Sequence, residues 1–509
     1  MQKNKFLKIA GLVSALIALA WTLVPEISQA ESPAYALVER HSSQRPIPLG
    51  QEQVVRRNPG FEVPAKIRAR VDFWVDIFTR YGKNQVVIHH RDFPQAVFSV
   101  LDFTREAEYL NPVQLEKLRK RTEAEEMASL KEEFKRLAVG AASGKRAEKI
   151  EAAMRLVPGG RSKYLTVVSD DLIRSQTGIR EKYGEAIKRS GRYIHFIEHI
   201  FVRDFGLPVE LTRLPFIESS FDYQAYSAVG AAGIWQFMRG TGRKYLTINN
   251  LLDERRDIHA ATRAAAKYFQ HAYSTLGTWP LSVTSYNHGI AGVYRKVKSY
   301  GSTDLATIIE DPSDRIFGFA SSNFYPEFLA ALEVYEKRAH YFPDIQEERA
   351  VSPYEVRLTR PVTVTSILRQ YPSLSLSELQ SLNFAVSDTI WRGRYPLPAG
   401  YTLKLPERYS GHAPEYAAAP GKESAPPLQA SSVYGGITYK IRKGDTLLSI
   451  AKRYGASVSE IMELNKISSA KTLKIGKVIT VKERSTPAPK RVVVKAKVST
   501  TGKVKKKRK

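Results

Sequence analysis

Hydrophobic side chains recur at helical spacing through the first part of this chain. Between residues 67 and 78 they stand at positions i, i+4, i+7, i+8 and i+11, which predicts a helix with one buried face (Ile67, Val71, Trp74, Val75 and Phe78). Charged helices are predicted over residues 112–139 and 145–155, and their mixed charges indicate solvated faces. Residues 86–89 fit a short strand. The pattern predicts an N-terminal helical region over residues 66–190.

The next stretch is more apolar. Residues 175–205 carry Ile, Tyr and Phe at helical spacing, so we expect helices that pack onto the central part of the chain. Asp257 precedes an amphipathic helix with an alanine-rich face, and residues 324–339 predict a closing helix. By contrast, residues 31–65 are rich in Pro, Ser and charge without a helical period, which predicts an extended lead-in.

The C-terminal part follows another pattern. Between residues 437 and 481 two alternating stretches bracket two short helical segments, which predicts a small α+β unit in βααβ order. Residues 408–435 are rich in Pro, Ala and Ser and predict a linker. Residues 483–509 are densely basic, and a segment of like charges is expected to be disordered.

The composition limits which kinds of site and which partners the protein can have. The chain of 509 residues is long enough for two or three domains, and it has no cysteine, which excludes disulfides, thiolate metal sites and cysteine nucleophiles. The net charge of +27, with +11 in residues 482–509, indicates an anionic partner. By charge alone, a membrane surface, an anionic wall polymer and nucleic acid fit equally well.

The N-terminus decides between these partners. Three lysines (Lys3, Lys5 and Lys8) precede an apolar run over residues 9–24, and Ser28-Gln29-Ala30 is a small-x-small cleavage signal. This order is typical of a secretory signal peptide over residues 1–30, with an uncleaved membrane anchor as the alternative. We therefore expect a protein of the periplasm or cell envelope, and no nucleic acid partner. Lipid attachment at a cleaved signal needs a cysteine, which this chain lacks.

A single carboxyl group is the first candidate for chemistry. Glu218 stands among Phe216, Ile217 and Phe221, and such surroundings disfavour the charged carboxylate, so the pKa of Glu218 should be raised. Pro208 can start a helix, and Pro215 should then kink that helix or begin a fresh turn. Glu218 would lie near a helix C-terminus, where the dipole acts in the same direction. A protonated carboxyl that later acts as a base suits the cleavage of a glycosidic bond.

Two further stretches complete the candidate site. Four glycines between residues 230 and 242 predict tight turns with room for a sugar to approach the backbone. Gln236 offers a donor and an acceptor for an acetamido group or for the catalytic carboxyl. Further along, Tyr286 can hydrogen-bond a carboxyl while Asn287 fixes the loop, and His288 is expected to be solvated.

These stretches, in this order, resemble a known family. Glu218-Ser219, then Gly233-Ile234-Trp235-Gln236-Phe237, then Tyr286-Asn287, with the connector over residues 253–263, are similar to the lysozyme-like lytic transglycosylases of bacterial cell walls. The resemblance implies a mainly α, goose-type lysozyme-like catalytic domain over residues 191–345. It also implies a peptidoglycan glycan strand as the substrate.

The resemblance implies a one-acid mechanism without metal or cofactor. Glu218 would be the catalytic residue, and Ser219, Gln236, Tyr286 and Asn287 would bind substrate. Glu218 would protonate the bond between N-acetylmuramic acid and N-acetylglucosamine and then accept the proton of the muramic C6 hydroxyl, which gives a 1,6-anhydro end. The other local acids match no second catalytic position of the family (Asp222, Asp253, Glu254 and Asp257). The three beside Arg255 and Arg256, namely Asp253, Glu254 and Asp257, are expected to cap helices and form salt bridges.

The C-terminal unit carries a second resemblance. Residues 436–482 are similar to a LysM carbohydrate-binding module, which implies glycan contacts by Gly444, Asp445, Thr446 and Asn465. Residues 350–407 resemble a degenerate module of the same kind.

Several alternatives stay open. A hydrolytic lysozyme on the same fold and a non-catalytic peptidoglycan-binding protein both fit parts of the pattern. His89-His90 suggests a metal site, but no third ligand stands at a suitable spacing, so solvated or hydrogen-bonded histidines are expected instead.

Overall fold

The computed structural model describes two compact units, one within residues 1–423 and one within residues 424–509. The described residues are 58, 60–311, 317–412, 437–441, 445–454, 458, 461–462, 465 and 476–482. The predicted signal peptide, most of the lead-in, most of the linker and the basic tail lie outside them. Among the described helices, none combines the length and the apolar character that crossing a membrane requires.

A three-stranded sheet forms one layer at the N-terminal side of the first unit. Strand β1 (Gln85–His90) lies between β2 (Val97–Asp102) and β3 (Ile173–Thr177), and both pairings are antiparallel. The strand predicted at residues 86–89 is confirmed. The helix predicted to begin at residue 175 is wrong at its start, because Ser175 pairs with Ile88 as part of β3.

Helices cover this sheet and were predicted closely. Helix α2 (Arg68–Thr79) follows a 3-10 turn, η1 (Ala65–Ile67), and the charged helices are α3 (Pro112–Ala138) and α4 (Lys145–Met154). Asn111 caps α3 in a reciprocal capping box with Gln114, which fixes where the helix begins. With α5 (Lys163–Ser169), α3 and α4 share a hydrophobic cluster with the sheet (Val86, Ile88, Phe98, Leu130, Phe134 and Ile150).

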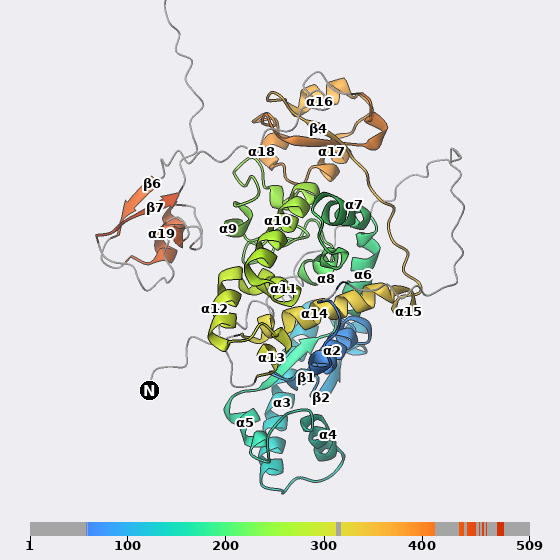
Figure 1. Ribbon diagram of the computed structural model, residues 1–509, viewed down its shortest axis with the longest axis vertical. Coiled ribbons are helices and arrows are strands. Elements are labelled where there is room, and N and C mark those ends of the chain that lie inside the picture. The colour runs from blue at the N-terminus through green and yellow to red at the C-terminus, as the bar shows by residue number, and fades with distance from the viewer. Residues whose placement is uncertain are drawn as a thin grey trace, which may run out of the picture. The chain divides into compact units, whose positions relative to one another are not determined.

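The main core of the unit is built around α14 (Phe319–Glu336). This helix packs along α2 and also contacts α11 (Trp279–His288) and α8 (Leu214–Glu218) (Figure 1). It begins five residues before the predicted start, after Gly318 at its N-cap, and it contains Pro326. Further helices complete this layer: α6 (Arg180–Ser190), α7 (Ile194–His199), α10 (Ile258–Leu276), α12 (Ile290–Tyr300) and α13 (Leu305–Glu310).

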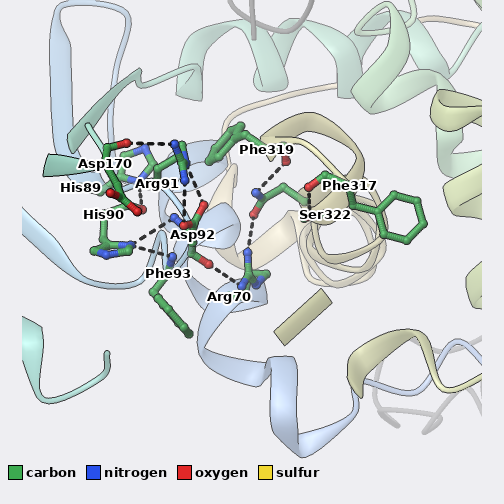
Figure 2. A network of polar contacts seen from close by, with 11 residues as sticks. Arg70, His89, His90, Arg91, Asp92, Phe93, Asp170, Phe317, Phe319 and Ser322 are labelled. Atoms are coloured by element: carbon green, nitrogen blue, oxygen red, sulfur yellow. Dashed lines mark hydrogen bonds and ion pairs between the residues drawn. The ribbon is translucent and has the colours of Figure 1, made fainter. Parts of the chain in front are cut away.

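A buried arginine joins the N-terminal layer to the main core. The Arg70 guanidinium donates to the Glu310 carboxylate over 2.8 Å and to Asn323 Oδ1 over 3.4 Å. It also donates to the Asp92 carbonyl oxygen over 2.7 Å (Figure 2). A buried guanidinium needs such partners because an unpaired charge in the interior is costly. The network therefore holds α2, the loop after β1, α13 and α14 together.

The histidine pair in this network is structural. His89 and His90 are both buried, and His90 Nδ1 accepts the backbone N–H groups of Asp92 and Phe93 over 3.1 Å each (Figure 2). Burial lowers the pKa of His89 to about 3 and that of His90 to about 4. Both rings are therefore neutral at pH 7. His89 Nδ1 forms a hydrogen bond with the His90 carbonyl oxygen. The hydrogen-bonded histidines expected from the sequence are thus present at both positions.

Residues 354–405 form a small arrangement of two strands and three short helices inside the first unit. Strands β4 (Tyr354–Arg357) and β5 (Thr402–Leu405) pair antiparallel, and between them lie α16 (Val364–Gln370), α17 (Leu376–Leu382) and α18 (Asp388–Trp391). The arrangement has its own hydrophobic cluster. It joins the main core by backbone hydrogen bonds to the segment before α10, from Asp253 N to Ala385 O over 2.8 Å and from Ser387 N to Leu251 O over 3.0 Å.

The second unit has the βααβ strands expected at the C-terminus. Strand β6 (Ile437–Lys440) pairs antiparallel with β7 (Val478–Lys482), and α19 (Leu447–Tyr454) follows β6. Its small core includes Ile450, Ile461 and Val481.

The same hydrogen bonds hold both small arrangements together. The Asn383 side chain donates to the carbonyl oxygens of Leu379 and Lys404 over 2.8 Å and accepts the Lys404 N–H over 3.0 Å. In the second unit the Asn465 side chain makes the same three bonds, each 2.7 Å long, to the carbonyl four residues earlier and to Thr480. The two segments therefore share this local pattern of side-chain-to-backbone hydrogen bonds.

Candidate functional site

Glu218 is the last residue of a short helix in the main core. Pro208 precedes the 3-10 helix η4 (Val209–Arg213), and Pro215 stands at the second position of α8, so the fresh turn predicted at this proline is confirmed. After Glu218 the backbone of Ser220 and Phe221 adopts positive φ values of 54° and 55°. Non-glycine residues in this region are strained, and such strain is found preferentially at functional sites.

The carboxyl group of Glu218 is half-buried and electrostatically unusual. Burial and the nearby Glu327 carboxylate on α14 raise the pKa of Glu218 to about 8. The rise expected from the apolar neighbours is thus present, and a second acid contributes to it. At pH 7 the Glu218 carboxyl is mostly protonated and can donate a proton.

Ser219 joins the first motif to the second. Its buried hydroxyl donates to the Ile234 carbonyl oxygen over 2.8 Å and lies 3.3 Å from the Pro215 carbonyl oxygen. The hydroxyl is therefore engaged within the protein, and its contribution is to hold the end of α8 against the turn at residues 233–237.

That turn is held by a buried arginine of the connector. The Arg255 guanidinium donates to the carbonyl oxygens of Gly230 and Phe237 over 2.6 and 3.0 Å, and it pairs with Asp253 over 2.6 Å. Asp257 accepts backbone N–H groups at the start of α10. The expectation that the acids beside Arg255 cap helices and form salt bridges is confirmed for Asp253 and Asp257.

The glycines of this turn serve internal packing more than sugar access. At Gly233 the φ angle is +73°, and a Cβ there would stand 1.9 Å from the Arg255 carbonyl oxygen. At Gly242 a Cβ would lie 2.8 Å from Ile248 Cδ1. The room predicted for a sugar is therefore filled by protein at Gly233 and Gly242, whereas Gly230 faces open space.

Gln236 stands at the mouth of a cleft. Its backbone φ is 46°, and its Nε2 donates to the Gly233 carbonyl oxygen over 2.8 Å, so one donor is used internally. Its neighbours Trp235 and Phe237 are both fully or almost fully buried, and Trp235 Nε1 donates to Thr262 Oγ1 over 3.0 Å.

Tyr286 meets the same turn from α11. Its hydroxyl donates to the Trp235 carbonyl oxygen over 2.7 Å. The bond to a carboxyl that the sequence suggested is thus made to a backbone carbonyl instead. Burial, with Glu218 close by, holds the pKa of Tyr286 well above its usual value. The phenol is neutral and remains a donor at neutral pH.

The two residues after Tyr286 contact α14. Asn287 is exposed near the end of α11, and its Oδ1 accepts the hydroxyl of Ser321 in α14 over 2.8 Å, so it joins two helices where the sequence suggested that it fixes a loop. The expectation of a solvated His288 is wrong. Its ring is half-buried, lies 3.0 Å from Ser321 Oγ and packs edge-on against Phe317.

A cleft of about 860 Å³ opens beside this constellation. Gln236, Tyr286 and Asn287 line it, whereas Glu218 and Ser219 are not among its lining residues. Aromatic and basic side chains supply much of the remaining lining, including Tyr245, Tyr268, Lys244 and Arg295. Such a mixture suits a sugar polymer that carries acidic groups.

Sequence reasoning missed two charged residues near Glu218. Glu327 lies in α14, and Lys182 of α6 interacts electrostatically with it. The available signal was a lone carboxylate in the apolar run of residues 324–332, which a helical pattern assigns to the buried face. Within the described residues, no group of three or more His, Asp or Glu side chains gathers as a metal site would require.

In the second unit the predicted glycan-binding residues have structural partners. Asp445 accepts the Tyr439 hydroxyl over 2.7 Å, and the Thr446 Oγ1 accepts the Ser449 N–H over 3.1 Å at the start of α19. Asn465 makes its three bonds to the backbone, and Gly444 lies outside the described residues.

Each of the two units contains a match to a known protein family. Residues 203–309 match the transglycosylase SLT domain, and residues 439–482 match the LysM domain. The first match spans α8, the turn, the connector, α10 and α11, and the second spans most of β6 to β7. These matches define the class as a transglycosylase with an appended LysM domain.

Closer relatives specify the family. The chain is 30% identical over 339 residues to membrane-bound lytic murein transglycosylase D of Escherichia coli strain K12, an alignment that covers 63% of this chain and 71% of that protein. The same values hold for the protein of E. coli O6:H1. The chain therefore belongs to the membrane-bound lytic murein transglycosylase D family.

Two further similarities are more limited. A tributyltin chloride resistance protein of Alteromonas sp. strain M-1 is 30% identical over 113 residues, which is 22% of this chain and 54% of that protein. Among solved structures, lytic transglycosylase Slt of Pseudomonas aeruginosa aligns with 42% of this chain and 31% of its own, at 17% identity and a TM-score of 0.24.

Proposed function

We propose that this protein is a peptidoglycan lytic transglycosylase of the cell envelope. It cleaves the β-1,4 bond between N-acetylmuramic acid and N-acetylglucosamine and leaves a 1,6-anhydromuramic end. The family relationship supports this activity, and the observation that carries the mechanism is the half-buried Glu218 carboxyl, with its pKa raised to about 8.

Glu218 acts as acid and then as base. Its carboxyl protonates the glycosidic oxygen as the bond from that oxygen to C1 of muramic acid breaks. The resulting carboxylate accepts the proton of the muramic C6 hydroxyl as O6 forms a bond to C1. Glu218 ends the cycle protonated, and no water is consumed. A hydrolase would instead add water at C1.

The surrounding residues hold substrate and carboxyl in place. Gln236 and Asn287 line the cleft and offer amide groups to the acetamido and hydroxyl groups of the glycan. Tyr286 and Ser219 act through the turn, because their hydroxyls bond the backbone at residues 235 and 234. The LysM unit retains the enzyme on glycan strands.

The domain organisation follows the same proposal. A signal peptide over residues 1–30 directs export, residues 191–345 form the catalytic domain, and residues 436–482 bind glycan. The segment around residues 354–405 is a second LysM-like fold, which the shared asparagine bonds support. A basic tail over residues 483–509 attracts an anionic wall polymer or a membrane surface.

Product analysis with a Glu218→Gln variant tests the proposal. The wild-type enzyme should release muropeptides with anhydro ends, which are one water lighter than hydrolysed ends in a mass spectrum. Loss of general acid–base catalysis should lower the rate at least about a hundredfold, while binding to sacculi persists. Hydrolysed ends would establish a lysozyme, and a variant that keeps a tenth of the activity would remove Glu218 from the mechanism.

A further inference from the structure

One short loop of the arrangement at residues 354–405 pairs with the start of the connector. The loop comprises residues 384–387 and lies between α17 and α18. Its backbone makes two hydrogen bonds to residues 251–253, 2.8 and 3.0 Å long, and between them Val386 forms a β-bridge with Leu252. The side chains of Val386 and Leu252 are each 4% exposed and share one hydrophobic cluster. The loop therefore holds residues 251–253 by both backbone and side chain.

The connector passes this restraint to the turn that carries Gln236. The Asp253 carboxylate accepts Nε and Nη2 of Arg255 over 2.8 and 2.6 Å. The Arg255 guanidinium in turn donates to two carbonyl oxygens of the turn over 2.6 and 3.0 Å. Arg255 is fully buried, so water does not compete for these bonds. The position of residues 251–253 therefore fixes the turn from which Gln236 faces the cleft.

The same loop also meets the chain just after Glu218. The ring of Phe384 lies 5.0 Å from the ring of Tyr223. Tyr223 follows Glu218 by five residues, beyond the two positions of positive φ that come after α8. The Arg192 guanidinium donates to the Tyr223 hydroxyl over 3.0 Å and so holds the far end of this side chain. The Phe384 ring thus restrains the backbone that leads away from Glu218.

We propose that Phe384 is a positioning residue of the catalytic site, and that the loop of residues 384–387 aligns Glu218 with Gln236. Residues 354–405 then belong to the catalytic structure, whereas residues 436–482 lie in a separate unit. This inference rests on the proposed function, in which Glu218 reacts with a glycan bound beside Gln236.

Other contacts attach residues 354–405 to α10 independently of Phe384. Oε1 of Glu355 in β4 lies 2.7 Å from His259 Nδ1, and the ion pair between Lys404 and Asp257 is buried. Loss of the Phe384 ring should therefore loosen the loop without detaching the whole arrangement. An effect on rate can then be separated from unfolding.

Kinetics of Phe384→Ala on a short soluble glycan test the proposal. A small displacement of a reacting group can cost a large part of the rate, so kcat should fall roughly tenfold while the variant stays folded by circular dichroism. Phe384→Tyr keeps the ring and should restore kcat. Tyr409→Ala is the matched control, because it removes another half-buried ring of the first unit, which lies 4.6 Å from the Tyr371 ring. It should leave kcat unchanged.

Val386→Ala tests the other side of the loop and does not depend on the Phe384 ring. The shortened side chain packs less tightly with Leu252, so the connector and Gln236 should shift and kcat/KM should fall. Val364→Ala is its control, because it removes the same two methyl groups from the same cluster, on α16, and Val364 is 6% exposed. Both variants should lose similar thermal stability, and only Val386→Ala should lose kcat/KM.

Hydrogen exchange measures the coupling without activity. In Phe384→Ala the backbone amides of residues 219–237 should exchange faster than in the wild type, and in Tyr409→Ala they should not. Unchanged exchange or an unchanged kcat in Phe384→Ala would overturn the inference. Equal losses of kcat in Phe384→Ala and Tyr409→Ala would also overturn it, because they would indicate a general loss of structure. If the wild-type enzyme releases no anhydro ends, the proposed function fails, whereas the exchange result still decides this inference.

Discussion

The Ser219 hydroxyl donates to the Ile234 carbonyl oxygen over 2.8 Å, although fifteen residues separate the two along the chain. This bond fixes the distance between the end of α8 and the turn whose next carbonyl, at Trp235, accepts the Tyr286 hydroxyl. Hydrogen bonds from two hydroxyls to backbone carbonyls thus fix the position of the proposed acid relative to the cleft.

Ser219→Ala should weaken catalysis more than stability. Loss of one hydrogen bond at a buried site costs about 1 kcal/mol of unfolding free energy, which thermal denaturation detects. Misplacement of Glu218 relative to the cleft should lower kcat roughly tenfold or more. Ser299→Ala removes a hydroxyl-to-backbone bond at an exposed position of α12 and serves as the control for such a loss away from the site. An unchanged kcat in Ser219→Ala would show that the bond does not position the carboxyl.

Replacing Glu218 should make the enzyme more stable in alkaline solution. The pKa of Glu218 is raised above that of the unfolded chain, so between about pH 4.5 and 8 the folded protein binds more protons. Its contribution to stability is fully present below the unfolded pKa and is lost as pH rises through about 8. Glu218→Gln should therefore exceed wild type in Tm at pH 8.5 by about 2 °C or more, with little difference at pH 4. Equal Tm values at pH 8.5 would contradict the raised pKa.

The ion pair between Lys404 and Asp257 should be critical for folding. Both side chains are buried, and the pair joins β5 to the residue that caps α10. Removal of one partner leaves a buried charge unpaired, so Lys404→Met should cost about 3 to 5 kcal/mol. Lys404→Met combined with Asp257→Asn should recover part of that loss. Denaturant titration measures the unfolding free energy of Lys404→Met and of the double variant. If both variants lose the same unfolding free energy, the broken ion pair is not the cause of the loss.

Deletion of residues 436–509 should separate wall binding from cleavage. Binding to insoluble peptidoglycan should weaken, while cleavage of short soluble glycans should stay nearly unchanged, because the SLT match lies within residues 203–309. Pull-down and product assays on one preparation measure both. Equal losses on the two substrates would show that the LysM unit takes part in catalysis.

Removal of residues 490–509 alone should reduce the salt-sensitive part of binding. Exposed charges are screened beyond about 8 Å at 0.15 M salt and beyond about 3 Å at 1 M. The tail truncation should therefore match the full chain at high salt and bind less at low salt. Identical salt dependence of the two would exclude the tail as a wall tether.

Local signals account for what the sequence predicted well. Asp257 marks the start of α10 because its side chain accepts the first free N–H groups, and Pro215 marks α8 because proline is best tolerated in the first turn of a helix. The raised pKa of Glu218 followed from its apolar neighbours, which are local as well. The asparagine bonds repeated at Asn383 and Asn465 accompany the order of residues that suggested two LysM-like segments.

Features that depend on distant partners were missed. Strand β3 exists because Ser175 meets Ile88, and nothing within Ile173–Thr177 alternates strongly enough to show it. His288 is half-buried because Ser321 and Phe317 lie against it. Glu327 gains its significance only from the approach of α8 and α6. In each case the decisive neighbour is more than 25 residues away along the chain.

The contact between α2 and α14 constrains when the protein can finish folding. Trp74 Nε1 donates to Asn323 Oδ1 over 3.2 Å, across 249 residues of chain. A chain that emerges N-terminus first, from a ribosome or from a translocation channel, presents the apolar face of α2 long before its partner helix exists. Chains that end before Phe319 leave Trp74 and Arg70 without their covering helix and should be recognised by chaperones or proteases. The N-terminal layer is therefore completed, and the enzyme becomes able to act, only after the single late helix α14 has emerged.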